Sequence, residues 1–302
     1  MMVRYERPYS HAAHWARRFA RIGFVIFVLS LAAHRFGPLT TPHFLALAAF
    51  AVAFALLAVL LAAVGLTRLW QVAAIGGTAS VSALFHAALP LGFFGYGAVQ
   101  YLTRPAIYDV STDTLTPPPW INAPVAEESW MKRKPIVTPE DREAQIAAYP
   151  GLTGRRYDGA LDRVFQGVRK VVEETRIATT AELGVENARA DLEDLAVGAG
   201  AGADTNREPE VVPVPATRPA PDIDGGMPGR RSSDIVLQGE WRTLIVGFRF
   251  DVLIRLREEA ETTLVDLRVA SRDGQHDLGI SAKFAEEFLR ALDAELLGIA
   301  GD

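Results

Sequence analysis

A sharp change in composition at about Leu102 constrains this chain more than any motif. From Ile22 to Leu102 the only charged side chains are Arg35 and Arg68, whereas the sequence beyond is polar, proline-rich and charged. Apolar stretches of about 20 residues span the hydrocarbon core of a bilayer when they form helices. We therefore predict an N-terminal membrane anchor, residues 1–102, followed by a soluble domain, residues 103–302.

Three apolar segments are predicted to cross the membrane, at about residues 19–36, 44–66 and 72–102. The second is almost entirely alanine, leucine, valine and phenylalanine. The third is longer than one crossing needs and contains Pro90, which predicts a tilt, a kink or a helix that continues beyond the bilayer. Because the first segment is followed by further spans, no cleavable signal peptide is expected.

The basic residues predict the orientation of these spans. Five arginines precede the first span against the single acid Glu6, whereas each following short loop holds one. The five are Arg4, Arg7, Arg17, Arg18 and Arg21. Positive flanks stay in the cytoplasm. Three crossings then place the soluble domain on the periplasmic side of a bacterial inner membrane, with the lipid bilayer as its first partner.

Two features of the third span each have alternative interpretations. Small residues recur there every four positions, at Ala79, Ala83 and Ala87. This spacing lets helices approach closely, within one chain or between two copies. His86 is the one ionisable side chain deep in a span. It forms a neutral hydrogen bond to a neighbouring helix, or it binds a metal or haem with His34 or His43.

Composition excludes several classes of function. The chain has no cysteine, so disulfides, zinc–thiolate sites, iron–sulfur clusters and thiol nucleophiles are excluded. Its net charge is −5 and the soluble part carries no basic stripe, so nucleic acid is not an expected partner. No cofactor or metal site is predicted, and no serine elbow, phosphate loop or paired glycosidase-like carboxylates can be identified.

The soluble domain is predicted to be α+β, a small antiparallel sheet with helices on one face. Apolar residues at helical spacing predict an amphipathic helix over 159–175, with a short strand near 176–182 after it. Alternating residues predict strands over 235–243, 244–258 and 263–272. A helix over 280–297, with Ser281 as its N-cap, then closes the domain.

Two further segments are predicted to be irregular. Residues 103–150 contain eight prolines, a density that disfavours helix and central strand, so we expect an extended arm over the folded core. Tyr108, Trp120 and Trp130 would be its apolar contacts. Residues 198–233 are rich in glycine, proline, alanine and charge, which predicts a disordered insert.

Three stretches carry a resemblance to a known family. They are Y-D-V-S-T-D-T at 108–114 with P-P-P-W at 117–120, G-F-R-F-D-V at 247–252, and D-L-R-V-A-S-R-D-G-Q-H-D-L-G at 266–279. Together they resemble the signatures of the bacterial and plastid family catalogued as domain of unknown function 1499, over about residues 105–296. The long insert and the segment Ile280-Ser281-Ala282 depart from its usual pattern. The resemblance implies a membrane-associated domain, often on the far side, without an established activity.

The first candidate site is a dense group of short polar side chains: Asp109, Ser111, Thr112 and Asp113. They form a local turn network that satisfies backbone groups. Alternatively, both carboxylates bind a cation or small ligand, although the spacing does not fit an EF-hand loop.

The second candidate is the predicted outward face of the strands, which carries Arg249, Asp251, Arg255, Arg257, Asp266, Arg268 and Arg272. Such faces are commonly solvated, with charges paired across strands. In one alternative, the acidic arm docks there and the arginines bind its carboxylates bidentately. In another, the arginines bind an anionic lipid headgroup or glycan.

The third candidate is Asp277, beside His276, which is expected to cap the last helix rather than to act as an acid or base. No residue is assigned a catalytic role. The sequence thus predicts a periplasmic binding or interaction domain for an envelope protein or anionic lipid. The alternatives are an envelope hydrolase that uses Asp109, Ser111 and Asp113 or Asp277, and a transport or redox component centred on His86.

Overall fold

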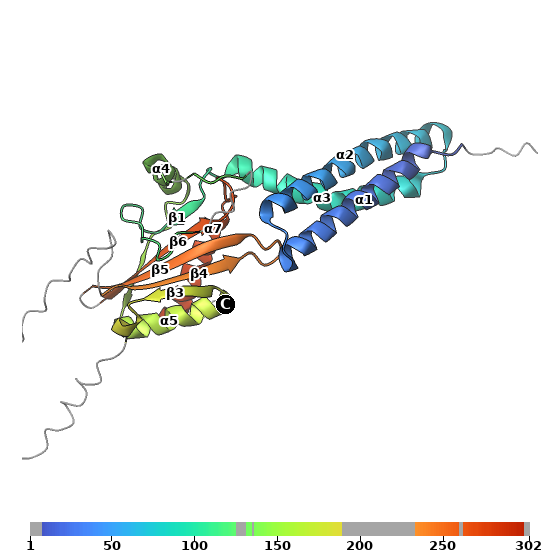
Figure 1. Ribbon diagram of the computed structural model, residues 1–302. Helices are drawn as coiled ribbons and strands as arrows, with labels where there is room; N and C mark the ends of the chain where they lie inside the picture. Colours follow the sequence, from blue (N-terminus) through green and yellow to red (C-terminus); the bar gives the residue numbers. More distant parts are fainter. Residues whose placement is uncertain (1–7, 125–130, 135, 189–232, 260–261, 299–302) are drawn as a thin grey trace, which may run out of the picture.

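A bundle of three long helices leads into a domain built on one antiparallel sheet (Figure 1). The structure, a computed structural model, describes residues 8–124, 131–134, 136–188, 233–259 and 262–298. The predicted fold class, three apolar helices followed by an α+β domain, is confirmed. The predicted insert lies outside the described residues except for its last residue, and Trp130 lies outside them too.

The bundle consists of α1 (His11–Phe36), α2 (Thr41–Val72) and α3 (Gly77–Thr103). Each helix is long and apolar enough to cross a membrane. The third begins five residues later than predicted, because α2 continues to Val72 and a left-handed Ala73 (φ 53°) then ends it. The first begins at His11, earlier than predicted, and includes Arg17, Arg18 and Arg21.

Small side chains hold the three helices close together. Ala16 and Ala20 of α1, Ala58 and Ala62 of α2, and Ala83 of α3 form one buried cluster. Ala79 and Ala87 of α3 are buried as well. The alanine repeat of the third span is therefore used for packing within the chain, where a small residue lets backbones approach.

Over the described residues the sheet has six strands. They are β1 (Asp109–Ser111), β2 (Arg155–Asp158), β3 (Ala178–Leu183), β4 (Ile235–Arg242), β5 (Arg249–Glu259) and β6 (Thr262–Ser271). Their order is β1-β6-β5-β4-β3, and every pairing is antiparallel. The short strand β2 pairs with the other half of the β6 edge. Two segments distant in sequence thus share one edge of β6, which brings the arm onto the sheet.

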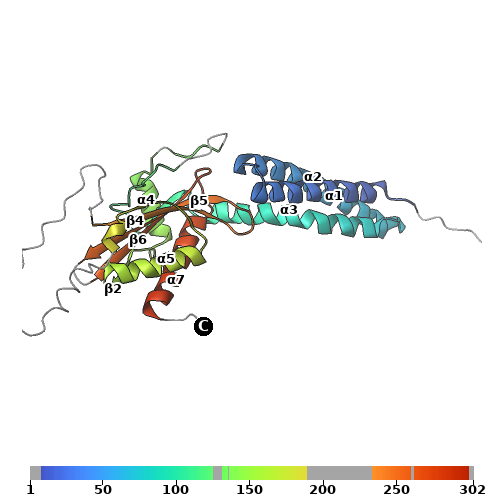
Figure 2. The ribbon, with the colours of Figure 1, turned by 60° about the horizontal axis from the view of Figure 1, so that its bottom comes forward.

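Two helices cover one face of the sheet, α5 (Leu161–Glu174) and α7 (Ile280–Leu297) (Figure 2). Their apolar stripes pack on alternate residues of the strands, because successive side chains of a strand point to opposite faces. The core strand residues are Ile235, Leu237, Phe250, Val252, Ile254, Leu256, Val265, Leu267 and Val269. The intervening residues, including the predicted arginines, therefore belong to the other face.

Several local predictions were wrong or missed an element. The arm contains a helix, α4 (Pro139–Ala148), because its proline occupies the first turn, where no N–H is needed, and Thr138 and Asp141 form a capping box. It also contains β1, and β2 was not predicted. Strand β5 begins at Arg249 rather than at 244, because residues 243–248 form a turn. The helix α7 has Gly279 rather than Ser281 as its N-cap.

Candidate functional site

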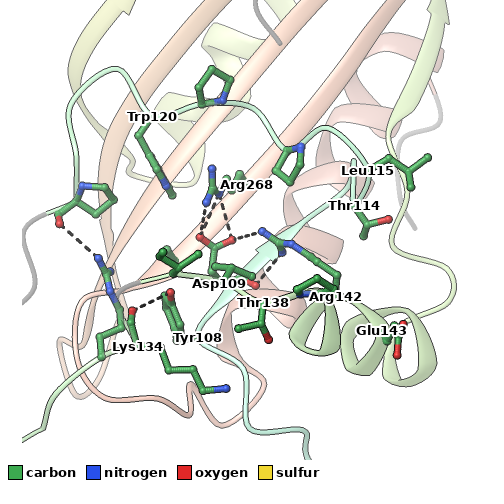
Figure 3. A pocket seen from close by; sticks show the side chains of 18 of the residues that line it. Tyr108, Asp109, Thr114, Leu115, Trp120, Lys134, Thr138, Arg142, Glu143 and Arg268 are labelled. Carbon is green, nitrogen blue, oxygen red and sulfur yellow. Dashed lines mark hydrogen bonds and ion pairs between the residues drawn. The ribbon is translucent and has the colours of Figure 1, made fainter. Parts of the chain in front are cut away.

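The arm crosses the second face of the sheet and encloses a cleft with α4 (Figure 3). The cleft has a volume of about 1080 Å³. Its floor comes from β1 and β6, and its walls come from the arm and from the chain that leads into α4. The residues that line the cleft include Asp109, Trp120, Arg133, Arg142 and Arg268.

The floor of the cleft is a carboxylate held by two guanidinium groups. Arg268 of β6 donates from Nε and Nη2 to both oxygens of Asp109, at 2.8 to 3.1 Å. Arg142 of α4 donates to the same carboxylate at 2.8 Å and to the Asp109 carbonyl at 3.0 Å. The antiparallel register, with Asp109 opposite Ala270, places Arg268 diagonally across from the acid. Asp109 is buried, so these charges are paired out of solvent.

Aromatic rings and a third arginine complete the floor. The Arg268 guanidinium lies 4.9 Å from the ring centroid of Trp120, and the Arg133 guanidinium lies 5.1 Å from that of Tyr108. Arg133 donates to the carbonyls of Ser271 and Pro124. Burial and the neighbouring Asp109 raise the pKa of the Tyr108 phenol, so it remains a neutral hydrogen-bond donor.

Positive charge predominates on this floor. Among the residues that the structure describes, three guanidinium groups, those of Arg133, Arg142 and Arg268, face the single carboxylate of Asp109, which leaves a balance of two positive charges. Lys134 also lines the cleft, but its ammonium is 2.7 Å from Asp141. Glu143 projects from α4 apart from the floor, as Figure 3 shows. The cleft is therefore suited to an anion.

A second cluster fixes the arm beside the cleft. Arg255 of β5 is fully buried and binds the carboxylates of Asp266 and, at 3.0 Å, Asp113. Thr112 links the same group, because its hydroxyl donates to Asp266 and accepts from the Leu267 N–H. Here the expectation of a solvated strand face is wrong, since the acidic arm docks on it.

Asp113 also forms the local turn network that the sequence predicted. It accepts from the N–H groups of Leu115 and Thr116 at 3.1 and 2.8 Å. Partial burial opposes its ionisation, but the bonds from Thr116 and Arg255 outweigh burial and hold its pKa below the usual value. Asp113 is therefore a charged tether of the arm.

The remaining predicted arginines lie outside the cleft. Arg272 binds Asp251 bidentately and also contacts Glu240 at 2.8 Å. Arg249 begins β5, opposite Arg242 in β4. Its charge helps to lower the pKa of the Glu240 carboxyl, a pKa that burial alone would raise. These residues form a separate ion-pair group on the sheet, so the structure divides the predicted arginine face into distinct clusters.

The residues of the hydrolase alternative do not converge. Ser111 is fully buried on β1, where its backbone bonds the side chain of Gln145. Asp277 accepts the N–H groups of Gly279 and Ser281 at the start of α7, and burial raises its pKa despite these bonds. His276 instead bonds the carbonyls of Tyr101 and Arg104 at the end of α3. An accessible nucleophile beside a base is not formed by these side chains.

His86 forms its hydrogen bond within its own helix, to the Ser82 carbonyl at 2.7 Å, rather than to a neighbouring helix. His34 bonds Thr41 and the Val246 carbonyl, and His43 bonds Thr40. Over the part of the chain that the structure describes, no group of three or more histidine, aspartate or glutamate side chains could hold a metal ion. The three histidines therefore do not form a shared centre.

A family model described as "Protein of unknown function (DUF1499)" matches residues 202–292. Over those residues the chain is similar to this family. The DUF1499 match includes β4, β5, β6 and most of α7, and with them Arg249, Arg255, Arg268 and Arg272. The arm that carries Asp109 and Asp113 precedes it. Searches of curated proteins and of solved structures found no match.

Sequence reasoning missed the contribution of α4 to this site. Arg142 and Gln145 lie three residues apart on one face of the helix, and both contact β1. The run Thr138-Pro139-Glu140-Asp141 is a helix-start signal that could have revealed α4. Because the density of prolines in the arm predicted an extended chain, α4 was not predicted, and Arg142 was not assigned to a candidate site.

Proposed function

We propose that this is an integral protein of a bacterial inner membrane that displays a binding domain in the periplasm. Three helices of sufficient length and apolarity support the membrane assignment. Arg17, Arg18 and Arg21 lie in the first half of α1 and Arg68 lies near the end of α2, toward the end of the bundle that is remote from the soluble domain (Figure 1). The positive-inside rule assigns that end to the cytoplasm.

The ligand that we propose is an anionic group of an envelope component, and the observation that carries this is the arginine-rich floor of the cleft. A guanidinium has five N–H donors. The bonds of Arg268 to Asp109 and Pro118 use three of them, and those of Arg142 to Asp109 and Gln145 use three as well. Within the described part of the chain, two N–H groups of each arginine therefore remain for a ligand. Planar donors of this kind bind carboxylate and phosphate strongly.

The walls give the ligand a second property. Leu115, Ile136 and Ile146 expose apolar side chains along the cleft, together with several prolines and Trp120. Pockets that combine apolar walls with a few convergent polar groups are typical of small-ligand sites. We therefore propose an anion attached to a short apolar chain.

This role is binding rather than catalysis. The carboxylate of Asp109 is committed to two arginines, and Asp113 is committed to Arg255 and Thr116. A general base must be free to accept a proton from the reacting group. Ion-paired carboxylates instead keep the arginines oriented toward the ligand.

Titration of the full-length protein with small anions tests the proposal. We expect inorganic phosphate to bind weakly and ethyl and butyl phosphate to bind progressively tighter, by about fourfold for each buried methylene. Intrinsic tryptophan fluorescence, to which Trp120 contributes, and the thermal midpoint would report binding. Butyrate and butanol would show how a carboxylate and an uncharged group on the same chain compare with the phosphate. Arg142→Gln should weaken the whole series and Arg142→Lys should weaken it less.

Arg169→Gln is the matched control, because Arg169 lies on α5 and pairs with Glu182 instead. It should leave every affinity unchanged. Equal affinities for butanol and butyl phosphate, or an Arg142→Gln protein that binds as tightly as the natural one, would contradict the proposed site.

A further inference from the structure

The turn that joins β4 to β5 exposes two large apolar side chains at the end of the helix bundle. Leu244 is 69% exposed and Ile245 is 75% exposed. Figure 1 shows this turn, residues 243–248, reaching the end of α1. A pair of exposed apolar residues on a soluble domain needs no explanation by itself. Its position beside three apolar helices is what gives this pair a meaning.

Specific bonds hold the turn against the bundle. The Val246 carbonyl lies 2.8 Å from Nδ1 of His34, and Nε of Arg35 donates to the Leu244 carbonyl at 3.1 Å. Gly247 has a φ of +90°, and a Cβ there would lie 3.0 Å from Cδ of Arg35. The turn therefore follows the last turn of α1 closely.

Apolar packing fixes the same contact. Val246 and Phe248 pack on the cluster formed by Phe27, Phe44, Ala48 and Ala51 at this end of the bundle. The ring centroids of Phe44 and Phe248 are 6.5 Å apart. These two residues of the turn point toward the helices, and Leu244 and Ile245 are left facing outward.

A second attachment prevents the domain from pivoting about the turn. His276 bonds the carbonyls of Tyr101 and Arg104 at the end of α3, at 3.2 Å each. Its ring also stacks on Tyr101, with centroids 4.7 Å apart. The β4–β5 turn thus contacts α1, and the loop that carries His276 contacts the end of α3. These two contacts fix the height of the turn relative to the bundle.

The apolar length of α2 sets that height relative to a bilayer. At 1.5 Å per residue, the apolar stretch 44–66 is about 35 Å long, against about 30 Å for the hydrocarbon core. Its two ends therefore lie near the two boundaries between acyl chains and headgroups. Phe44 is the first residue of this stretch and contacts the turn. Phe36, at the end of α1, is exposed at the same end.

We infer that Leu244 and Ile245 insert into the acyl–headgroup boundary of the lipid bilayer, so that the β4–β5 turn is a second membrane contact of the soluble domain. This inference rests on the membrane anchoring proposed above. Transfer of apolar side chains from water to the acyl boundary lowers the free energy of the system. Neighbouring arginines can remain at headgroup level. The contact holds the sheet, and with it the cleft, at a defined orientation to the membrane.

Single nitroxide labels test this depth. Because the chain has no cysteine, each introduced cysteine is a unique attachment point. Ile245→Cys is the test variant, in full-length protein reconstituted into phosphatidylcholine nanodiscs. Ile136→Cys is a matched control, because Ile136 is 73% exposed and lies on the cleft wall. Phe85→Cys, at a position of α3 that is 77% exposed, reports the membrane interior.

Accessibility to dissolved oxygen and to a water-soluble nickel chelate is then compared by power saturation. We expect the label at 85 to be far more accessible to oxygen than to the nickel chelate, and the label at 245 to be moderately more accessible to oxygen, as labels at the acyl–headgroup boundary are. The label at 136 should be more accessible to the nickel chelate. A label at 245 that matches 136 while 85 remains deep would overturn the inference and leave the anchor intact. A label at 85 that favours nickel would overturn the membrane proposal itself.

Discussion

Replacing Asp113 by Asn should release the arm from the sheet without unfolding the domain. Asp113 and Asp266 both bind the buried guanidinium of Arg255. Breaking a buried ion pair completely costs about 3–5 kcal/mol, because an uncompensated charge remains. Here Arg255 keeps Asp266, so the loss is closer to one charge-assisted hydrogen bond, about 1.5–3 kcal/mol. Asp113 retains 22% side-chain exposure, which favours the lower value.

A loss of about 1.5 kcal/mol corresponds to a local opening equilibrium that is about tenfold more favourable. Amide hydrogen exchange of the full-length protein measures it directly. Peptides that cover residues 109–120 should exchange about tenfold faster, while those from α5 and α7 should not change. Asp266→Asn should have the larger effect, because its carboxylate is almost fully buried. Asp158→Asn, at an exposed position of β2, is the control.

The pH dependence gives an independent check. Because the pKa of Asp113 is lower in the folded protein than in the unfolded chain, its stabilisation is complete above the unfolded value and disappears as pH falls to the folded one. After correction for intrinsic rates, the ratio of the arm's exchange rates in Asp113→Asn and in the natural protein should be constant above about pH 4. Below about pH 4 this ratio should fall toward one. Unchanged exchange of the arm in Asp113→Asn at neutral pH would refute the argument that this pair tethers it.

Three further changes have expected outcomes. Burial raises the pKa of Asp277, so its contribution has the opposite sign: the natural protein should lose stability relative to Asp277→Asn as pH rises above about 4, measured by denaturant midpoints. Gly247→Ala should cost about 1–3 kcal/mol and speed amide exchange in the β4–β5 turn, because φ is +90° there, whereas Gly151→Ala, with open space around it, should not. Thr138→Ala removes the cap of α4 at a cost of about 1 kcal/mol, so its amides should exchange about fivefold faster, and an unchanged rate would show that the cap is unnecessary.

The membrane helices and the central strands could be predicted because composition and alternation determine them locally. The helix that begins at Ile280 and the strand over 262–271 follow directly from periodic apolar residues. The docking of the arm on the arginine face could be stated only as an alternative. Its decisive contacts join residues such as Asp113 and Arg255 that are far apart in sequence, and alternation reports a face without its partner.

The cleft itself could not be predicted. It depends on α4, whose proline is compatible with a helix only because it lies in the first turn. It also depends on β1, a three-residue strand that forms because the edge of β6 is available to it. The apolar turn at 244–246 was assigned to a strand, because the same alternation serves a sheet core and a contact with the helix bundle. Tertiary context decided each of these cases.

Reporter fusions at Asp302 test the central claim, a domain exported by three crossings, most directly. Alkaline phosphatase folds actively only outside the cytoplasm, whereas a green fluorescent protein exported in unfolded form remains dark. We expect active phosphatase and no fluorescence from the C-terminal fusions in intact cells, with the opposite result for fusions placed after Val72, at the end of the second helix. An inactive phosphatase together with bright fluorescence at Asp302 would contradict the account.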